Sequence, residues 1–226
     1  HKDHFIGKCR HIFNLDLDLN PFYRICRKDP VLYSVISSGR GRLMRSESIY
    51  EDIFKSICST NIQWKQAVKM INRIGRAGSQ VTGSDYRCFP TPRQILDKGE
   101  SFLKEQGRAG YRSRYLIDLC RRFLDNEPKA LKAEKGELCA KTLKHYFLSF
   151  SGIGKTTARY LMALYGHFEE IAVDSLVISY LSKTVFDGKQ PNEKQIHEYF
   201  SCYGKWAYLA YWMEFILAGG WKPREE

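Results

Sequence analysis

Two short segments of the sequence carry the residues that could do chemistry. The first, Ser-Gly-Ile-Gly-Lys at 151–155, joins two stretches whose apolar residues have helical spacing. Gly152 and Gly154 permit a turn too tight for residues with a β-carbon. The N–H groups that begin the second helix favour an anion there, and Lys155 adds a positive charge beside them. The segment therefore predicts a phosphate clamp.

Two other interpretations of the glycine segment stay open. A corner between two ordinary helices uses the same residues. A nucleotide-binding loop also combines glycines with a helix N-terminus, but it follows a parallel strand, and no strand pattern precedes Gly152. The turn alone therefore does not distinguish a phosphate clamp from a structural corner.

The second segment places one acid, Asp174, directly after the apolar triplet Ile171-Ala172-Val173 and before an apolar helix. An acid in this position is typical of a helix N-cap, which binds the first free N–H groups of the helix. Taken alone, that structural role is the simpler interpretation of Asp174. A chemical role becomes the better one only together with the glycine turn upstream.

The glycine turn followed at this distance by Asp174 strongly resembles the signature of the helix-hairpin-helix (HhH-GPD) DNA glycosylase superfamily. Within it, the chain resembles the branch of the 8-oxoguanine and 3-methyladenine DNA glycosylases. Blocks similar to the 8-oxoguanine glycosylases occur in the same order along nearly the whole chain. They are Phe13-Asn14-Leu15-Asp16, Asn20-Pro21-Phe22-Tyr23, Ser56-Ile57-Cys58-Ser59-Thr60-Asn61, Gly110-Tyr111-Arg112-Ser113-Arg114-Tyr115 and Cys202-Tyr203-Gly204-Lys205-Trp206-Ala207.

The resemblance implies roles for individual residues. Asp174 would stabilise the oxocarbenium-like sugar as the base leaves, and would orient or deprotonate the attacking water. Asn61 would fill the gap left by the flipped nucleotide and contact the orphaned base. Tyr111 would wedge into the stack, and Arg112 would contact the edge of the orphaned base. Flipping costs a few kcal/mol of stacking, which is why a wedge and a gap-filler are needed. The alternative for Tyr111 is an exposed aromatic residue without a role in DNA binding, and the alternative for Arg112 is an arginine that binds a phosphate.

One position departs from the pattern of the bifunctional family members. In those enzymes a lysine two residues after the second hairpin glycine attacks the sugar and then supports strand cleavage, whereas here that position is Thr156. A threonine cannot form a Schiff base. One residue turns a helical side chain by roughly 100°, so Lys155 should face the phosphates rather than the pocket. The resemblance thus implies a monofunctional enzyme, and it stays open whether Thr156 is the natural residue.

The resemblance also implies a base pocket that includes the last helix. Phe215 keeps the position of a stacking phenylalanine, but Tyr211 replaces a base-contacting amide of the 8-oxoguanine branch and Leu176 replaces a histidine. These changes favour an apolar, aromatic pocket, suited to an electron-poor alkylated purine held by stacking and cation–π attraction. Further aromatic residues nearby are interpreted as mostly core: Trp206, Tyr208, Trp212 and Trp221.

Helical periodicity dominates the elements that must position these residues. It predicts helices at 30–36, 49–57, 67–74, 92–96, 115–123, 138–148, 155–165, 177–185, 196–200 and 206–217. Only 39–44 and the surroundings of Val81 are expected to be extended. With the resemblance, this predicts an all-α, two-lobed helical bundle with a cleft between the lobes. One lobe would join 1–60 to 167–226, and the other, 61–166, would contain the helix-hairpin-helix at about 139–166.

The composition points to a polyanionic partner. The chain has 226 residues, of which 43% are hydrophobic and 14% aromatic, enough for a real core. Lys and Arg total 36 against 25 acids, so the net charge is +11. A surplus of this size suggests nucleic acid first and an anionic membrane second. A merely soluble basic protein is the alternative.

The cysteines, apolar runs and termini add several expectations. Seven scattered cysteines form no Cys-x-x-Cys pair, so we expect no zinc site, no iron–sulfur cluster and no cofactor. Most cysteines are expected to be reduced core residues. No apolar run approaches the ~18 residues of a membrane span, and no leader pattern occurs. We expect an intracellular monomer located with DNA, in the nucleus or the nucleoid. Because the chain begins at His1 rather than Met, we expect a fragment of a longer protein.

The leading hypothesis is a monofunctional glycosylase that acts on damaged purines in double-stranded DNA, alkylated bases such as 3-methyladenine first. An 8-oxoguanine glycosylase, or a bifunctional glycosylase/lyase whose lysine is replaced by Thr156, is the alternative. A non-catalytic helix-hairpin-helix protein that only binds DNA is a third. The position of Asp174 within the whole set of family blocks argues against that last class.

Overall fold

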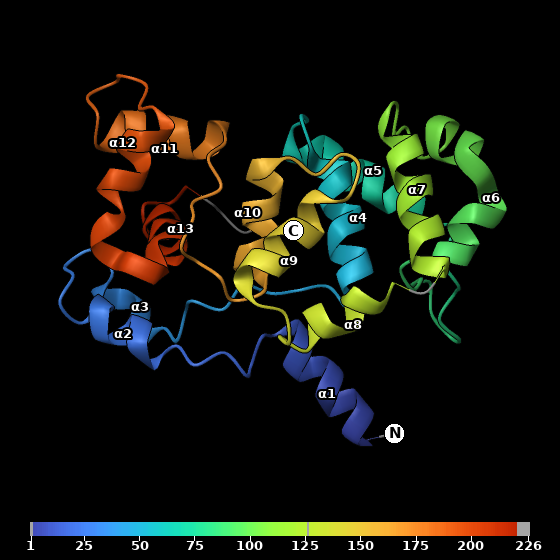
Figure 1. Cartoon of the computed structure of the whole chain (residues 1–226), viewed down its shortest axis with the longest axis horizontal. Coiled ribbons are helices and arrows are strands. Elements are labelled where there is room, and N and C mark those ends of the chain that lie inside the picture. The colour runs from blue at the N-terminus through green and yellow to red at the C-terminus, as the bar shows by residue number, and fades with distance from the viewer. Residues whose placement is uncertain (1, 126, 221–226) are drawn as a thin grey trace. The chain divides into compact units, whose positions relative to one another are not determined.

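The computed structural model describes residues 2–125 and 127–220, and nearly all their regular structure is helical (Figure 1). The helices are α1 (Lys2–Ile12), α2 (Asn20–Cys26), α3 (Tyr33–Ser37), α4 (Ile49–Ser59), α5 (Trp64–Gly75), α6 (Pro92–Glu105), α7 (Arg112–Leu124), α8 (Pro128–Glu134), α9 (Ala140–Leu148), α10 (Lys155–Leu164), α11 (Ser175–Thr184), α12 (Glu193–Tyr199), a 3₁₀ helix (Ser201–Trp206) and α13 (Ala207–Leu217). These residues form no strand, and Gln80 pairs with Arg87 in an isolated antiparallel bridge. The predicted all-α fold is confirmed. Trp221 lies outside the described residues.

The described chain divides into two compact units. The first comprises residues 2–45 and 162–220, and the second comprises 46–161 without residue 126. The division crosses α10, which therefore begins in the second unit and ends in the first. The cleft between two lobes stays a prediction.

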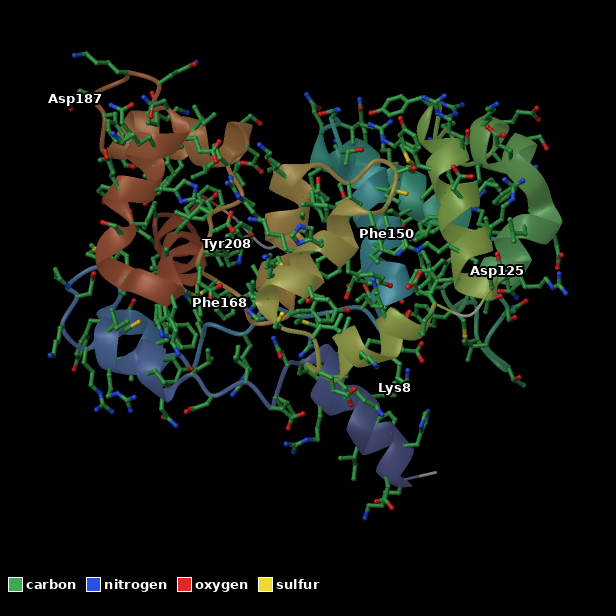
Figure 2. The ribbon with its side chains drawn as sticks, viewed as in Figure 1. Lys8, Asp125, Phe150, Phe168, Asp187 and Tyr208 are labelled. Atoms are coloured by element: carbon green, nitrogen blue, oxygen red, sulfur yellow. The ribbon has the colours of Figure 1, made fainter. Side chains whose placement is uncertain are left out.

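Helix α4 lies at the centre of the second unit. Ser48 closes its N-terminus by accepting a hydrogen bond from the N–H of Glu51 at 3.4 Å. The apolar face of α4 is buried, and the helix packs against α5, α7 and α8. Tyr50 contacts Phe123 with ring centroids 5.3 Å apart, and Phe123 stacks on Phe150 at 6.1 Å. Figure 2 labels Phe150 among the side chains of this unit, where α6 and α7 run along each other (Figure 1). This packing supports the hairpin at Phe150, just before its turn.

The first unit is built around α13, which is apolar on nearly all sides and therefore buried. The core cluster of this unit comes from the segment before α11, from α11, from α12 and its C-cap, and from α13: Ile171, Val177, Leu181, Ile196, Phe200, Ala207, Tyr211 and Phe215. The N–H of Tyr208 donates to the carbonyl of Phe168 at 2.9 Å, and Phe168 stacks on Trp206 (both Phe168 and Tyr208 are labelled in Figure 2). These contacts attach the loop that leads to Asp174 to the start of α13.

The cysteines correct one expectation. All seven are free thiols, but only Cys26, Cys58 and Cys120 are buried. Burial raises the pKa of the Cys58 thiol to about 12 and that of Cys120 to about 11. Cys88, Cys139 and Cys202 are exposed, so the expectation that most cysteines are core residues is wrong. The periodic apolar pattern around a residue does not show which side of a short helix or loop it occupies.

In the part of the chain that is described, no helix is both long and apolar enough to cross a bilayer.

Candidate functional site

The glycine segment forms a tight turn between α9 and α10. Gly152 has φ of +89°, and a β-carbon there would lie 2.8 Å from Cδ2 of Tyr115. The carbonyl of Gly154 accepts the N–H of Ala158 at 2.9 Å, so Gly154 stands at the start of α10. A β-carbon on Gly154 would meet nothing within 4 Å. The backbone conformation and packing require a glycine at 152, whereas position 154 leaves open space before the helix N-terminus.

We expect Gly152→Ala to lower the free energy of unfolding of the protein by about 1–3 kcal/mol. An alanine at positive φ is strained, and its methyl group would overlap Cδ2 of the Tyr115 ring. Thermal or urea unfolding measures this loss. Gly154→Ala is the matched control and should unfold like the unsubstituted protein. Equal stability of both variants would show that the Tyr115 ring moves aside without cost.

The first two residues of α10 differ in exposure. Lys155 is exposed, and Thr156 is half-buried. The two side chains leave the helix in different directions, as the helical rotation of about 100° per residue requires. Lys155 therefore presents its charge to solvent next to the open helix N-terminus.

Two segments that are distant in the sequence, around Asn61 and around Tyr111 and Arg112, meet in the second unit. Arg112, at the start of α7, is buried and donates a hydrogen bond to the carbonyl of Thr60 at the end of α4. Its guanidinium also lies over the ring of Tyr111, with Cζ 4.6 Å from the centroid. Asn61 follows Thr60, is exposed and has φ of +49°, a conformation that asparagine tolerates. The structure thus brings Asn61, Tyr111 and Arg112 together.

Tyr111 and Arg112 differ in solvent exposure, and this difference limits what each side chain can contact. Tyr111 is 49% exposed, whereas Arg112 is 6% exposed. Nε of Arg112 is buried and has no hydrogen-bond partner within the described residues. A guanidinium carries five N–H donors, so Arg112 keeps donors beyond the one used by Thr60. Its contact with a base edge stays a prediction, while its contact with the loop of Asn61 is present in the structure.

Asp174 is the N-cap of α11. Its Oδ1 accepts the N–H groups of Leu176 at 2.9 Å and of Val177 at 3.0 Å. Oδ2 accepts no hydrogen bond from any residue that the structure describes, and the side chain is exposed. The cap therefore fixes the carboxylate through one oxygen and leaves the other oxygen available. A structural cap and a chemical role are compatible in this geometry.

The residues expected to form a base pocket lie near Asp174 in the first unit. Tyr211 and Phe215 are 3% and 4% exposed and belong to the core cluster, whereas Leu176 is exposed. Burial raises the pKa of the Tyr211 phenol, and the negative charge of Asp174 raises it further. Phe215 stacks on Trp212 with centroids 5.7 Å apart. The surroundings of Asp174 are thus aromatic, and most of this aromatic surface is packed inside the unit.

Sequence reasoning missed a buried carboxylate one turn from Tyr211. Glu214 is 7% exposed and accepts a hydrogen bond from the hydroxyl of Tyr180 at 2.8 Å. Burial raises the pKa of Glu214. The signal available in the sequence was a single acid within the otherwise apolar run of α13. Among the described residues, no three His, Cys, Asp or Glu side chains cluster in a way that could hold a metal ion.

Comparison with known proteins places this geometry in a family. A family model described as the HhH-GPD superfamily base excision DNA repair protein matches residues 54–204. A probable N-glycosylase/DNA lyase of Methanothermobacter thermautotrophicus is 23% identical in an alignment of 215 residues that includes 85% of this chain and 67% of that protein.

Solved structures share the fold. The 3-methyladenine DNA glycosylase from Archaeoglobus fulgidus has a TM-score of 0.77 and 22% identity, over 98% of this chain and 76% of that one. The 8-oxoguanine glycosylase/lyase of Clostridium acetobutylicum in its apo form has a TM-score of 0.75 and 21% identity, over 96% of this chain and 76% of that one. The family match begins within α4 and includes the hairpin and Asp174, and it confirms the resemblance found in the sequence. The chain therefore belongs to the HhH-GPD superfamily of base excision DNA repair proteins.

Proposed function

We propose that this protein is a monofunctional DNA glycosylase, which hydrolyses the N-glycosidic bond of a damaged purine and does not cleave the strand. The main observation behind this proposal is Thr156 at the second residue of α10, where the bifunctional pattern requires a lysine. The exposed Lys155 beside it supports a role in phosphate binding instead. Asp174, with one oxygen free of the cap, would assist the attacking water and stabilise the positive charge that develops on the sugar.

Binding of the duplex is assigned to the second unit. The N–H groups at the start of α10 and the charge of Lys155 would hold a backbone phosphate. Tyr111 would enter the base stack, and Asn61 would occupy the space of the flipped nucleotide. Arg112 would then contact the orphaned base through the donors that Thr60 does not use. We propose that the protein works as a monomer on double-stranded DNA.

Alkylated purines such as 3-methyladenine are the preferred substrate in this proposal. Such bases are electron-poor, and aromatic rings attract them by stacking and cation–π interaction. The ring of Tyr211 near Asp174, against which Phe215 packs, supports this choice, since Tyr211 replaces the amide and Leu176 the histidine of the 8-oxoguanine pattern. The structural likeness to a 3-methyladenine glycosylase is in keeping with it.

An 8-oxoguanine glycosylase, with or without lyase activity, is the second candidate. Two similar proteins favour it, because the archaeal relative is a probable N-glycosylase/DNA lyase and one solved neighbour is an 8-oxoguanine glycosylase/lyase. In that case Thr156 would be a substitution at the lysine position. The two candidates differ in the damaged base that is released and in whether the DNA strand is cleaved.

Duplexes that each carry one defined lesion test the proposal. We expect base release from DNA with 3-methyladenine or a related alkylated purine at a rate at least about tenfold above that from 8-oxoguanine, because a contact unsuited to the base costs roughly 1–3 kcal/mol. Released bases are separated chromatographically, and strand breaks are counted with and without alkali. An undamaged duplex is the control. Faster release of 8-oxoguanine would reverse the substrate assignment, and no release from any lesion would leave a DNA-binding protein.

A further inference from the structure

Tyr115 contacts both groups of residues that the proposed function assigns to DNA. It lies in the first turn of α7 and is half-buried within the second unit. On one side its ring backs the hairpin, because a β-carbon on Gly152 would lie 2.8 Å from Cδ2. On the other side it meets the ring of Tyr111 edge to face, with centroids 6.0 Å apart and an interplanar angle of 76°. One side chain therefore joins the hairpin turn to the residue proposed as the wedge.

Neighbouring arginines complete this arrangement. Cζ of Arg114 lies 5.1 Å from the centroid of the Tyr115 ring, and its Nη2 donates to the Tyr115 hydroxyl at 3.4 Å. The guanidinium of Arg112 lies over the Tyr111 ring and also donates a hydrogen bond to the carbonyl of Thr60, the residue before Asn61. Contacts thus run without interruption from the hairpin through two tyrosine rings to the loop of Asn61.

We propose that Tyr115 is a positioning residue for base extrusion, which transmits the position of the phosphate-bound hairpin to the Tyr111 wedge. The inference rests on the proposed function, since it needs Gly152 and Gly154 to hold a phosphate and Tyr111 to enter the base stack. A wedge must meet the stack at a set distance from the bound phosphate. Misplacement by 1 Å can cost about a hundredfold in rate at a reacting centre, so the support of such a residue matters.

The ring of Tyr115 is the part that supplies this support. Tyr111 is 49% exposed, and an exposed ring without a packed neighbour samples several rotamers. The edge-to-face contact with Tyr115 restricts that freedom, while the contact with Gly152 fixes Tyr115 against the hairpin. The hydroxyl of Tyr115 serves only Arg114 among the described residues. Phenylalanine would therefore keep both ring contacts, and leucine would lose the aromatic pair.

Base unstacking measured by fluorescence tests the role without using catalysis. The probe is a duplex with a stable abasic analogue and 2-aminopurine next to it, whose fluorescence rises when stacking is lost. We expect Tyr115→Leu to lower the equilibrium constant for unstacking about tenfold, because the aromatic pair accounts for a factor of that order. Its affinity for an undamaged duplex should stay within about twofold, since the hairpin itself is unchanged. Tyr115→Phe is the matched control and should unstack the probe like the unsubstituted protein.

Three outcomes would overturn the inference. They are full unstacking by the leucine variant, equal losses of unstacking and of undamaged-duplex affinity, and a phenylalanine variant as impaired as leucine. Tyr115→Met, which keeps the length of the side chain without the ring, replaces the leucine variant if that protein fails to fold, and the same outcomes apply. A wild-type protein that releases no damaged base would reject the proposed reaction, but the unstacking measurement would still decide the role of Tyr115.

Discussion

Asp174→Asn is expected to lower the rate of base excision by a factor of about a hundred or more while duplex binding is retained. Removing one group that stabilises developing charge in such a site costs roughly 3 kcal/mol or more. Asparagine caps helices about as well as aspartate, and its oxygen should accept the same N–H groups of Leu176 and Val177. The substitution thus removes the charge and spares the cap. Single-turnover release of the base and a gel-shift or anisotropy measurement of duplex binding check both parts.

Two controls separate chemistry from stability. Asp174→Ser also keeps a capping oxygen and should lose excision like asparagine. Asp174→Ala loses the cap as well, and its free energy of unfolding should fall by about 1 kcal/mol. Excision by the asparagine variant within about threefold of the unsubstituted rate would mean that Asp174 is only a helix cap.

The helices with a buried apolar face were predictable from the sequence. The predictions at 49–57 and 155–165 correspond to α4 (Ile49–Ser59) and α10 (Lys155–Leu164). Helix α1 was not predicted, because it buries no residue and so has no apolar face to reveal it. The helix predicted at 92–96 is longer in the structure. Gly99 leaves the helical conformation, with φ of +76°, but the helix resumes and runs to Glu105.

Some contacts of the candidate site join residues close in the sequence, and others join residues far apart in it. The N-cap geometry of Asp174 follows from residues two and three positions away, and a sequence pattern is sufficient to predict it. The bond from Arg112 to Thr60 joins residues 52 positions apart, and it depends on how α4 and α7 pack. No local pattern contains that information.

The sequence pattern also could not show which aromatic residues of the last helix are buried. Tyr211 and Phe215 were interpreted as pocket residues from their places on the last helix. The structure gives them 3% and 4% exposure within an aromatic cluster, so the core and the proposed pocket share the same rings. Their contact with a base stays a prediction. An aromatic residue on an apolar helix looks the same in sequence whether it faces a core or lines a cavity.

Borohydride is expected to trap no covalent complex between the unsubstituted protein and lesion DNA. Strand cleavage by β-elimination needs an amine that forms an imine with the opened sugar, and the hydroxyl of Thr156 cannot form one. Lys155 is the amine next to it in the hairpin, but its side chain is exposed and leaves α10 in another direction. Lesion DNA incubated with the protein should break only after alkali or heat. Gel electrophoresis after borohydride treatment measures the trapped fraction.

Thr156→Lys tests the same chemistry in the opposite direction. The half-buried position of Thr156 leaves its side chain partly accessible, and a lysine there would carry an amine at the place that the bifunctional pattern requires. We expect this variant to form a borohydride-trapped complex, with a trapped fraction at least about tenfold above background if the amine replaces water as the nucleophile. Lys155→Ala combined with Thr156→Lys is the control, and at duplex concentrations that saturate binding it should trap equally well, because residue 155 contributes phosphate binding and no nucleophile. Efficient trapping by the unsubstituted protein would contradict monofunctional chemistry and would assign the nucleophile to an amine outside the hairpin.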